Sequence, residues 1–98
     1  MVVTIFRSRL RPGVEAEYGP LAERMFALAA SLPGFVASKD YVADDGERVA
    51  VIEFASDAAH AAWRDHPEHR RVQQLGRERF YAAYRLQVCH VAKERVFP

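Results

Sequence analysis

The order in which apolar patterns follow one another along this chain constrains its fold more than any other feature of the sequence. Strand-like segments alternate with stretches in which apolar residues recur every three or four positions, the spacing of a helix face. Strands are predicted at residues 2–10, 35–42, 48–54 and 81–94, and helices at residues 15–32, 57–63 and 68–79. The order βαββαβ, with an interrupted second helix, predicts an α+β, ferredoxin-like fold whose four-stranded antiparallel sheet carries helices on one face.

Turn and breaker residues set the predicted boundaries. Pro20 lies early in the first helical stretch. Because proline lacks the N–H donor, the regular helix is expected to begin near it. Pro33-Gly34 is a stop signal for that helix. Asp44-Asp45-Gly46 predicts a hairpin turn, because aspartate and glycine tolerate the positive φ that such turns need.

Length and composition predict one globular domain spanning residues 1–98, with 50% hydrophobic and 28% charged residues. The net charge is +1 and no basic stripe emerges, which argues against a nucleic-acid partner. The single cysteine, Cys89, requires no oxidising compartment. No apolar run approaches the roughly 20 residues that cross a bilayer. We therefore expect a cytoplasmic protein with no membrane association.

The predicted sheet has one face that no helix covers. The strands at residues 48–54 and 81–94 carry apolar side chains on both sides, so neither side is suited to water. A second copy of the chain, packed sheet against sheet, would bury this face, and the added burial helps so short a chain. We predict a homodimer through the open face. A monomer with a mildly apolar face is the alternative.

Residues 62–71, with the sequence AWRDHPEHRR, are the strongest candidates for chemistry. Trp63, the only tryptophan, is interpreted as a core aromatic or as a pocket wall that stacks on a flat ligand. The helix should break at His66, because the residue before Pro67 avoids helical backbone. Imidazole titrates near neutrality, so His66 is the preferred base for a phenolic proton, with a backbone-binding role at the break as the alternative.

His69 is the second histidine of this stretch. It is predicted to contact the ligand, although a solvated residue in the first helical turn is the alternative interpretation. Two histidines around a proline do not make a metal-binding motif, even with His60 nearby in the sequence. No metal site is predicted.

Aromatic residues of the strands complete the predicted pocket. Tyr81, Tyr84 and Arg85 cluster at the start of the last strand. The two tyrosine hydroxyls can orient a substrate oxygen, and the guanidinium of Arg85 can stabilise an oxyanion. Phe6 and Tyr41 are predicted as further walls. For each of these residues, cross-strand pairing or core packing is the structural alternative.

Three stretches, residues 51–57, Trp63-x-x-His66-Pro67-x-His69 and residues 80–89, resemble the antibiotic biosynthesis monooxygenase (ABM) family of dimeric α/β barrels. The resemblance covers nearly the whole chain. It implies that two ferredoxin-like protomers join their sheets into a barrel, with a pocket in each protomer between sheet and helices. It also implies no cofactor, because the phenolates or enolates that such oxygenases use react directly with oxygen.

Some residues that the resemblance would supply are absent. The haem-degrading members pair an asparagine on the first strand with the helix tryptophan and a more distant histidine. This chain contains no asparagine, and Gln73 stands ten residues past Trp63. Haem degradation by that arrangement is therefore not expected. Anthrone-oxidising members also use an asparagine near the tryptophan, where this chain has His60 and alanines.

Three functional hypotheses follow. The first is a cofactor-independent monooxygenase that oxidises a phenolic, quinol or polyketide-like small aromatic molecule. In it His66 is the base, Trp63 the stacking wall, and Tyr84 or Arg85 the partner of the oxyanion. The second is a non-catalytic dimeric barrel that binds a small hydrophobic ligand. The third is haem binding through His66 or His69.

Overall fold

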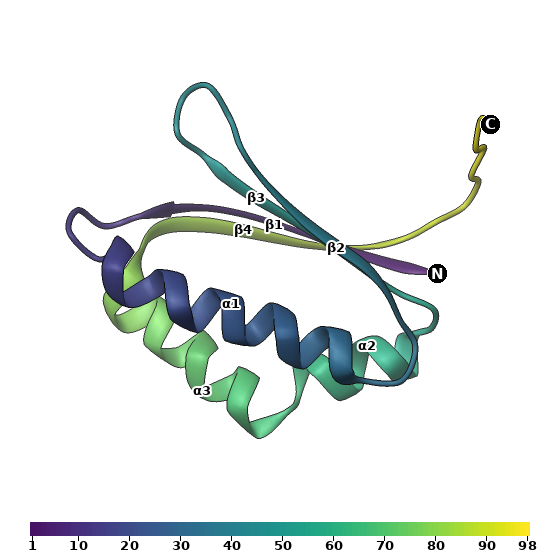
Figure 1. The fold of residues 1–98 in the computed structure, drawn as a ribbon, viewed down its shortest axis with the longest axis horizontal. Helices are drawn as coiled ribbons and strands as arrows, with labels where there is room; N and C mark the ends of the chain where they lie inside the picture. The colour runs from purple at the N-terminus through teal and green to yellow at the C-terminus, as the bar shows by residue number, and fades with distance from the viewer.

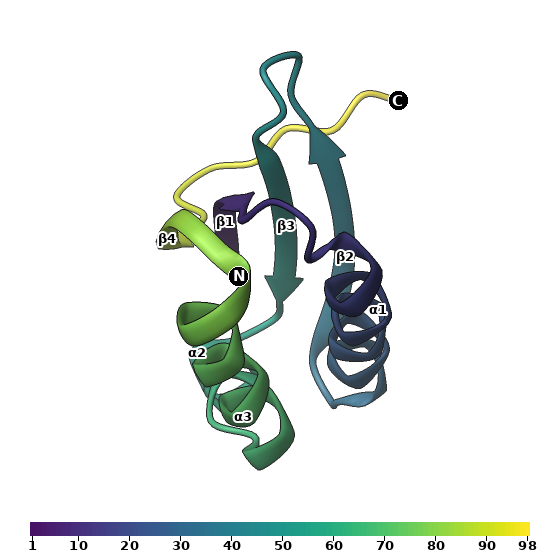
Figure 2. The same cartoon turned by 90° about the vertical axis from the view of Figure 1, so that its left-hand side faces the viewer.

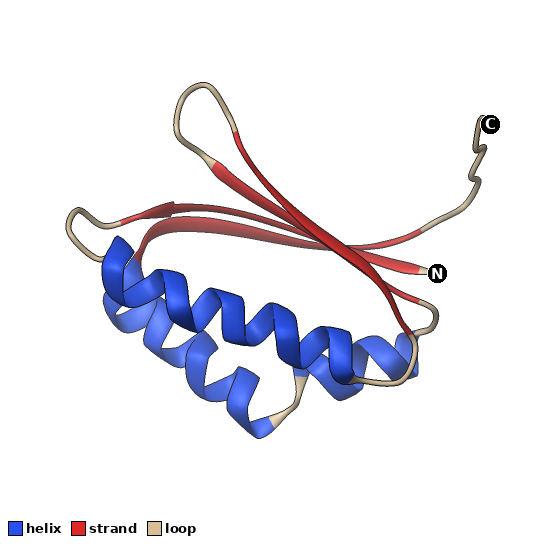
Figure 3. Cartoon of the chain, in the orientation of Figure 1, coloured by secondary structure: helices blue, strands red, loops and turns tan.

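The computed structural model describes residues 1–98 as a four-stranded antiparallel sheet with helices on one face (Figures 1 and 3). The sheet order is β2-β3-β1-β4, so the first strand lies inside the sheet next to the last. The predicted ferredoxin-like βαββαβ arrangement is therefore confirmed. None of its helices is both long enough and apolar enough to cross a membrane. The elements are β1 (Val2–Leu10), α1 (Glu15–Ser31), β2 (Phe35–Val42), β3 (Arg48–Phe54), α2 (Asp57–Arg64), α3 (Pro67–Leu75), the π-helix η1 (Gly76–Phe80) and β4 (Tyr81–His90).

Pairing between the strands decides which side chains face the helices. Thr4 of β1 pairs with Ile52 of β3, and Phe6 pairs with Ala50. Residues that pair directly across antiparallel strands lie on the same face of a sheet. This face covers the core, and Figure 2 shows the helices below it in two columns, α1 in one and α2 with α3 in the other. The opposite face carries Val3, Ile5, Val49 and Val51.

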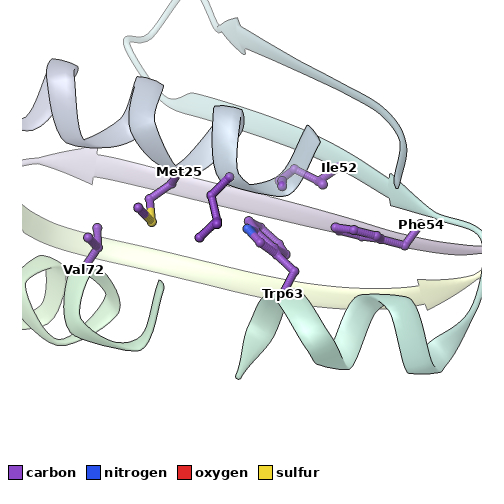
Figure 4. Packing of buried hydrophobic residues seen from close by; sticks show 7 residues of the cluster. Met25, Ile52, Phe54, Trp63 and Val72 are labelled. Carbon is purple, nitrogen blue, oxygen red and sulfur yellow. The ribbon is translucent and has the colours of Figure 1, made fainter. Parts of the chain in front are cut away.

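The core lies between the sheet and the helices. Phe54 of β3 is fully buried, and the ring centroids of Phe54 and Trp63 are 5.6 Å apart. Figure 4 shows the Trp63 indole reaching from α2 into the space between α1 and the sheet, near Ile52. Burying an aromatic side chain of this size is worth several kcal/mol. The indole thus joins both helical columns to the sheet.

The predicted turns and breaks are confirmed. Gly34 and Gly46 have φ of +83° and +89°, which explains glycine at the end of α1 and in the β2–β3 hairpin. The Ser56 hydroxyl caps α2 by accepting a hydrogen bond from the Ala59 N–H at 3.1 Å. The helical segment after β3 breaks between α2 and α3, immediately before Pro67.

Two boundaries differ from the predictions. The expectation that regular helix begins near Pro20 is wrong, because α1 begins at Glu15 and runs through the proline. Ala16, whose carbonyl loses its helical donor there, is exposed, so water can bind that carbonyl. The last strand ends at His90 rather than near residue 94. His90 pairs with Val2, the first residue of β1, and beyond it the partner strand has ended.

Candidate functional site

A cavity of about 350 Å³ lies between the sheet, α1 and the α2–α3–η1 segment. Of its 18 lining residues, 12 are hydrophobic, which is the wall composition typical of small-molecule sites. Each layer contributes residues. The sheet supplies Thr4 and Phe6, α1 supplies Tyr18 and Met25, and α2 supplies Trp63.

Trp63 and His69 form a stacked pair on one wall of the cavity. Their ring centroids are 4.1 Å apart with an interplanar angle of 19°. His69 Nδ1 lies 3.0 Å from the Trp63 carbonyl oxygen. Because a carbonyl oxygen can only accept, Nδ1 carries the proton and donates it. The other ring nitrogen, Nε2, then holds the lone pair that could accept a proton from a ligand.

The helix break explains how His69 reaches Trp63. His66 is the N-cap of α3, and its Nδ1 accepts a hydrogen bond from the Glu68 N–H at 3.1 Å. The chain turns at this cap, and His69, in the first turn of α3, folds back over the end of α2. His69 therefore also satisfies a carbonyl at the C-terminus of α2, where helix carbonyls lack intrahelical donors.

Burial keeps His69 in its neutral form. Removal from water lowers its pKa from the ordinary 6.5, and the hydrogen bond to the Trp63 carbonyl only partly opposes this shift. A neutral imidazole at pH 7 can accept a proton, whereas an imidazolium cannot. His69 therefore has both the tautomer and the protonation state of a general base.

His60 is a buried histidine on the same wall that the sequence predictions left out of the pocket. Its Nε2 lies 2.8 Å from the Thr4 hydroxyl, and these side chains come from residues 6% and 2% exposed. Burial lowers the pKa of His60, and the nearby Arg64 charge lowers it further. His60 precedes Trp63 by three residues, so both lie on one face of α2. This three-residue spacing is the sequence feature from which His60 could have been predicted to line the same pocket as Trp63.

The Trp63 indole also offers a hydrogen-bond donor. Its Nε1 is buried and has no acceptor in the protein. Buried donors without a partner are rare and costly, so this one calls for an explanation. A ligand oxygen in the cavity would supply the missing acceptor.

The opposite end of the cavity is built from tyrosines. The hydroxyls of Tyr18 and Tyr81 lie 3.0 Å apart, and burial raises the pKa of Tyr81, which keeps its hydroxyl protonated. The Tyr81 ring packs against Gly76 in the place that a Cβ there would occupy. The Arg11 side chain holds this segment by donating to the backbone carbonyls of Arg77, Glu78 and Tyr81.

Five of the predicted site residues are brought together by the structure. The lining of the cavity includes Phe6, Trp63, His69, Tyr81 and Tyr84. Phe6 contacts both tyrosine rings, with centroid distances of 5.3 Å and 5.6 Å. Phe6 meets the two tyrosines because the residues of a strand alternate between its faces and because β1 and β4 pair in this register.

Three predicted site residues lie elsewhere. His66 does not line the cavity, because its ring nitrogen caps α3. Arg85 pairs with Arg7 on the open face of the sheet, since alternate residues of a strand point to opposite faces. Tyr41 pairs with Val49 on the same open face and borders only a small hollow of about 40 Å³. The geometry therefore offers no support for these three residues as cavity groups.

Solved structures similar to this one share its whole architecture. Rv0793 from Mycobacterium tuberculosis superposes with a TM-score of 0.85 at 21% identity, covering 97% of this chain and 98% of that one. An asparagine-to-alanine mutant of SnoaB, a cofactor-independent oxygenase from Streptomyces nogalater, superposes with a TM-score of 0.80 at 19% identity, covering 95% of this chain and 94% of that one. At these identities the likeness shows the fold alone.

Sequence comparison identifies the family. The uncharacterized protein YqjZ of Bacillus subtilis (strain 168) is 38% identical over 80 residues, which cover 82% of this chain and 70% of YqjZ. The family model for antibiotic biosynthesis monooxygenase matches residues 1–75. The match includes β1, α1, both strands of the hairpin and the Trp63–His69 wall. This chain therefore belongs to the antibiotic biosynthesis monooxygenase family.

Proposed function

We propose that this protein is a cofactor-independent monooxygenase that oxidises a phenolic, quinol or polyketide-like aromatic molecule in the cavity. The observation that carries the proposal is the stacked Trp63–His69 pair, 4.1 Å between centroids, with His69 Nδ1 committed to the Trp63 carbonyl. The pair combines a flat wall for an aromatic ring with a neutral base. In this proposal His69 takes the role that the sequence alone favoured for His66.

The proposed chemistry begins with a proton transfer. A phenol or enol bound beside His69 gives its hydroxyl proton to Nε2, and the resulting anion is electron-rich enough to react with molecular oxygen. One oxygen atom enters the substrate as a carbonyl and the other leaves as water. The substrate supplies all four electrons, so the reaction needs no external reductant. The unpartnered Trp63 N–H and the Tyr84 hydroxyl are proposed to hold the substrate oxygen during this step.

Oxygen consumption with a panel of hydroquinones, anthrones and polyphenols tests this function. We expect His69→Gln to lower kcat/KM by about 10²- to 10⁴-fold, the usual contribution of a general base. Because burial lowers the pKa of His69 from its ordinary 6.5, the loss of activity on acidification should have its midpoint below pH 6.5. The measurement is an oxygen-electrode assay across pH with a chelator present.

His66→Asn is the matched control, because asparagine also caps helices well and His66 does not line the cavity. It should keep nearly full activity. Loss of activity in this variant with retention in His69→Gln would reverse the assignment. Binding of the aromatics with no oxygen consumption at all would contradict the enzyme and favour the ligand-binding barrel.

We also propose that the protein is a homodimer that packs the open faces of two sheets together. No helix covers this face, and its strands present Val3, Ile5, Val49 and Val51 there. Val51 pairs with Lys39 of the neighbouring strand, so the apolar centre has a charged border. This pattern of apolar centre and polar rim is typical of protein interfaces.

A charge placed at the centre of this face should separate the protomers. We expect Val51→Lys to convert the dimer to a monomer at micromolar concentration, because two unpaired ammonium groups would be buried opposite each other. Ala30→Lys on the exposed part of α1 is the control and should leave the assembly unchanged. Sedimentation-velocity ultracentrifugation measures both. A monomeric unsubstituted protein would refute the proposal.

A further inference from the structure

Arg77 is the one cation in the cavity lining that has no acidic partner. The lining contains no aspartate or glutamate and two arginines, Arg64 and Arg77. Arg64 binds both carboxylate oxygens of Asp65 at 2.9 Å, and together with Arg70 it lowers the pKa of Asp65 to about 2. The guanidinium of Arg77 forms no ion pair. Arg77 is an exposed residue that also lines the cavity, so the cavity lining carries one positive charge that has no ion-pair partner.

The carboxylates nearest to Arg77 in sequence and at this end of the molecule have other hydrogen-bond partners. Glu78 accepts a hydrogen bond from the Gln74 amide at 3.0 Å. Glu17 of α1 pairs with Arg79 at 2.9 Å. Neither carboxylate forms an ion pair with Arg77. An anionic group on a ligand would meet a free guanidinium, whose fork of N–H donors matches a carboxylate.

Helix periodicity places Arg77 relative to His69. The two residues are eight positions apart, and Gln73, halfway between, also lines the cavity, so all three share one face of the α3–η1 segment. A rise of about 1.5 Å per residue separates His69 from Arg77 by roughly 12 Å along the axis. This separation favours a ligand longer than one benzene ring.

The tyrosine end of the cavity lies beside Arg77. The Arg11 guanidinium binds the carbonyls of both Arg77 and Tyr81, at 3.3 Å and 3.1 Å, which holds the two backbone segments together. The Tyr18 and Tyr81 hydroxyls share one hydrogen bond, which uses only one of their two protons. The other proton is available to an anion at this end.

We infer that the ligand is an extended aromatic carboxylate whose acid group binds Arg77 at the tyrosine end while its hydroxyl-bearing ring lies against Trp63 and His69. The inference rests on the proposed function for the placement of the reacting ring. Its apolar body would cover the exposed side chains of Leu86 and Val88, which are 53% and 47% exposed although they line the cavity. Arg77 is thus assigned as the residue that selects acidic over neutral aromatics.

Calorimetric titration with two matched probes, 6-hydroxy-2-naphthoate and 2-naphthol, tests the assignment. The probes share the phenolic ring system and differ in the carboxylate. At pH 7 and low salt, we expect the acid to bind about 10- to 100-fold more tightly, the usual range for a charge-assisted hydrogen bond. Arg77→Gln should abolish this difference by weakening the acid alone, with the affinity for 2-naphthol unchanged.

Arg71→Gln is the matched control, because Arg71 is exposed on the same α3–η1 segment, as Arg77 is, but does not line the cavity. It should retain the full preference, and Arg77→Lys should retain part of it. Equal affinity for both probes in the unsubstituted protein, or a preference that survives Arg77→Gln, would overturn the inference. The readout is binding rather than oxygen consumption, so a failure here is distinguishable from a failure of the monooxygenase proposal.

Discussion

Replacing Trp63 with alanine is expected to lower the free energy of unfolding by about 3–5 kcal/mol. The side chain is only 6% exposed, packs against Phe54 with ring centroids 5.6 Å apart, and stacks on the His69 ring. Its removal would leave a void between α1 and the sheet. Small domains are stable by only about 5–15 kcal/mol, so this loss would remove a large share of the total.

Trp63→Phe is the matched control. A phenyl ring retains most of the contact with Phe54 and His69, so we expect it to lose less than half as much stability as the alanine variant. Urea unfolding followed by circular dichroism measures both, since neither variant keeps the tryptophan fluorescence. Equal losses in the two variants would contradict a role in packing. The phenylalanine variant should also lose activity, because it lacks the indole N–H that we propose binds the substrate oxygen.

Replacing Gly34 with alanine is expected to cost roughly 2–5 kcal/mol of folding stability. The φ of +83° costs a residue with a Cβ about 1–2 kcal/mol. The added Cβ would also lie 2.5 Å from the Ala59 Cβ, an overlap that adds about 1–3 kcal/mol. To relieve this overlap, either the turn after α1 must change its conformation or α2 must move away from the turn.

Gly46→Ala separates the two causes. Gly46 has a similar φ of +89°, but a Cβ there meets nothing within 4 Å, so only the backbone cost of about 1–2 kcal/mol should appear. Adding Ala59→Gly to Gly34→Ala should recover part of the packing loss, a coupling that a double-mutant cycle in urea measures. Equal destabilisation by Gly34→Ala and Gly46→Ala would show that the contact with Ala59 is unimportant.

Alternation along each strand predicted part of the cavity wall. Phe6 and Tyr84 lie on the helix-facing side of their strands, and both line the cavity. The same reasoning misplaced Tyr41, because β2 carries apolar residues on both faces and its own sequence does not say which face is inner. The pairing of Tyr41 with Val49 decides the matter, and it puts the tyrosine on the open face.

The two histidines around Pro67 show a second limit. Sequence rules located the helix break between α2 and α3 but not the angle at which the chain resumes. That angle makes His66 a cap for the Glu68 N–H and stacks His69 on Trp63. Either histidine was compatible with the local pattern. The preference for His66 rested on its position before the proline, where the local demand for a cap was the stronger effect.

The sequence by itself determined the order of the elements, the break before Pro67 and which residues of a strand share a face, because backbone preferences and periodicity act over a few residues. The tertiary structure decided which of the candidate residues meet in one site and added His60, Tyr18 and Arg77 to them. Thr4 meets His60 across 56 positions of the chain, and Tyr18 meets Tyr81 across 63. Such contacts depend on how helices settle on the sheet, which local patterns do not specify.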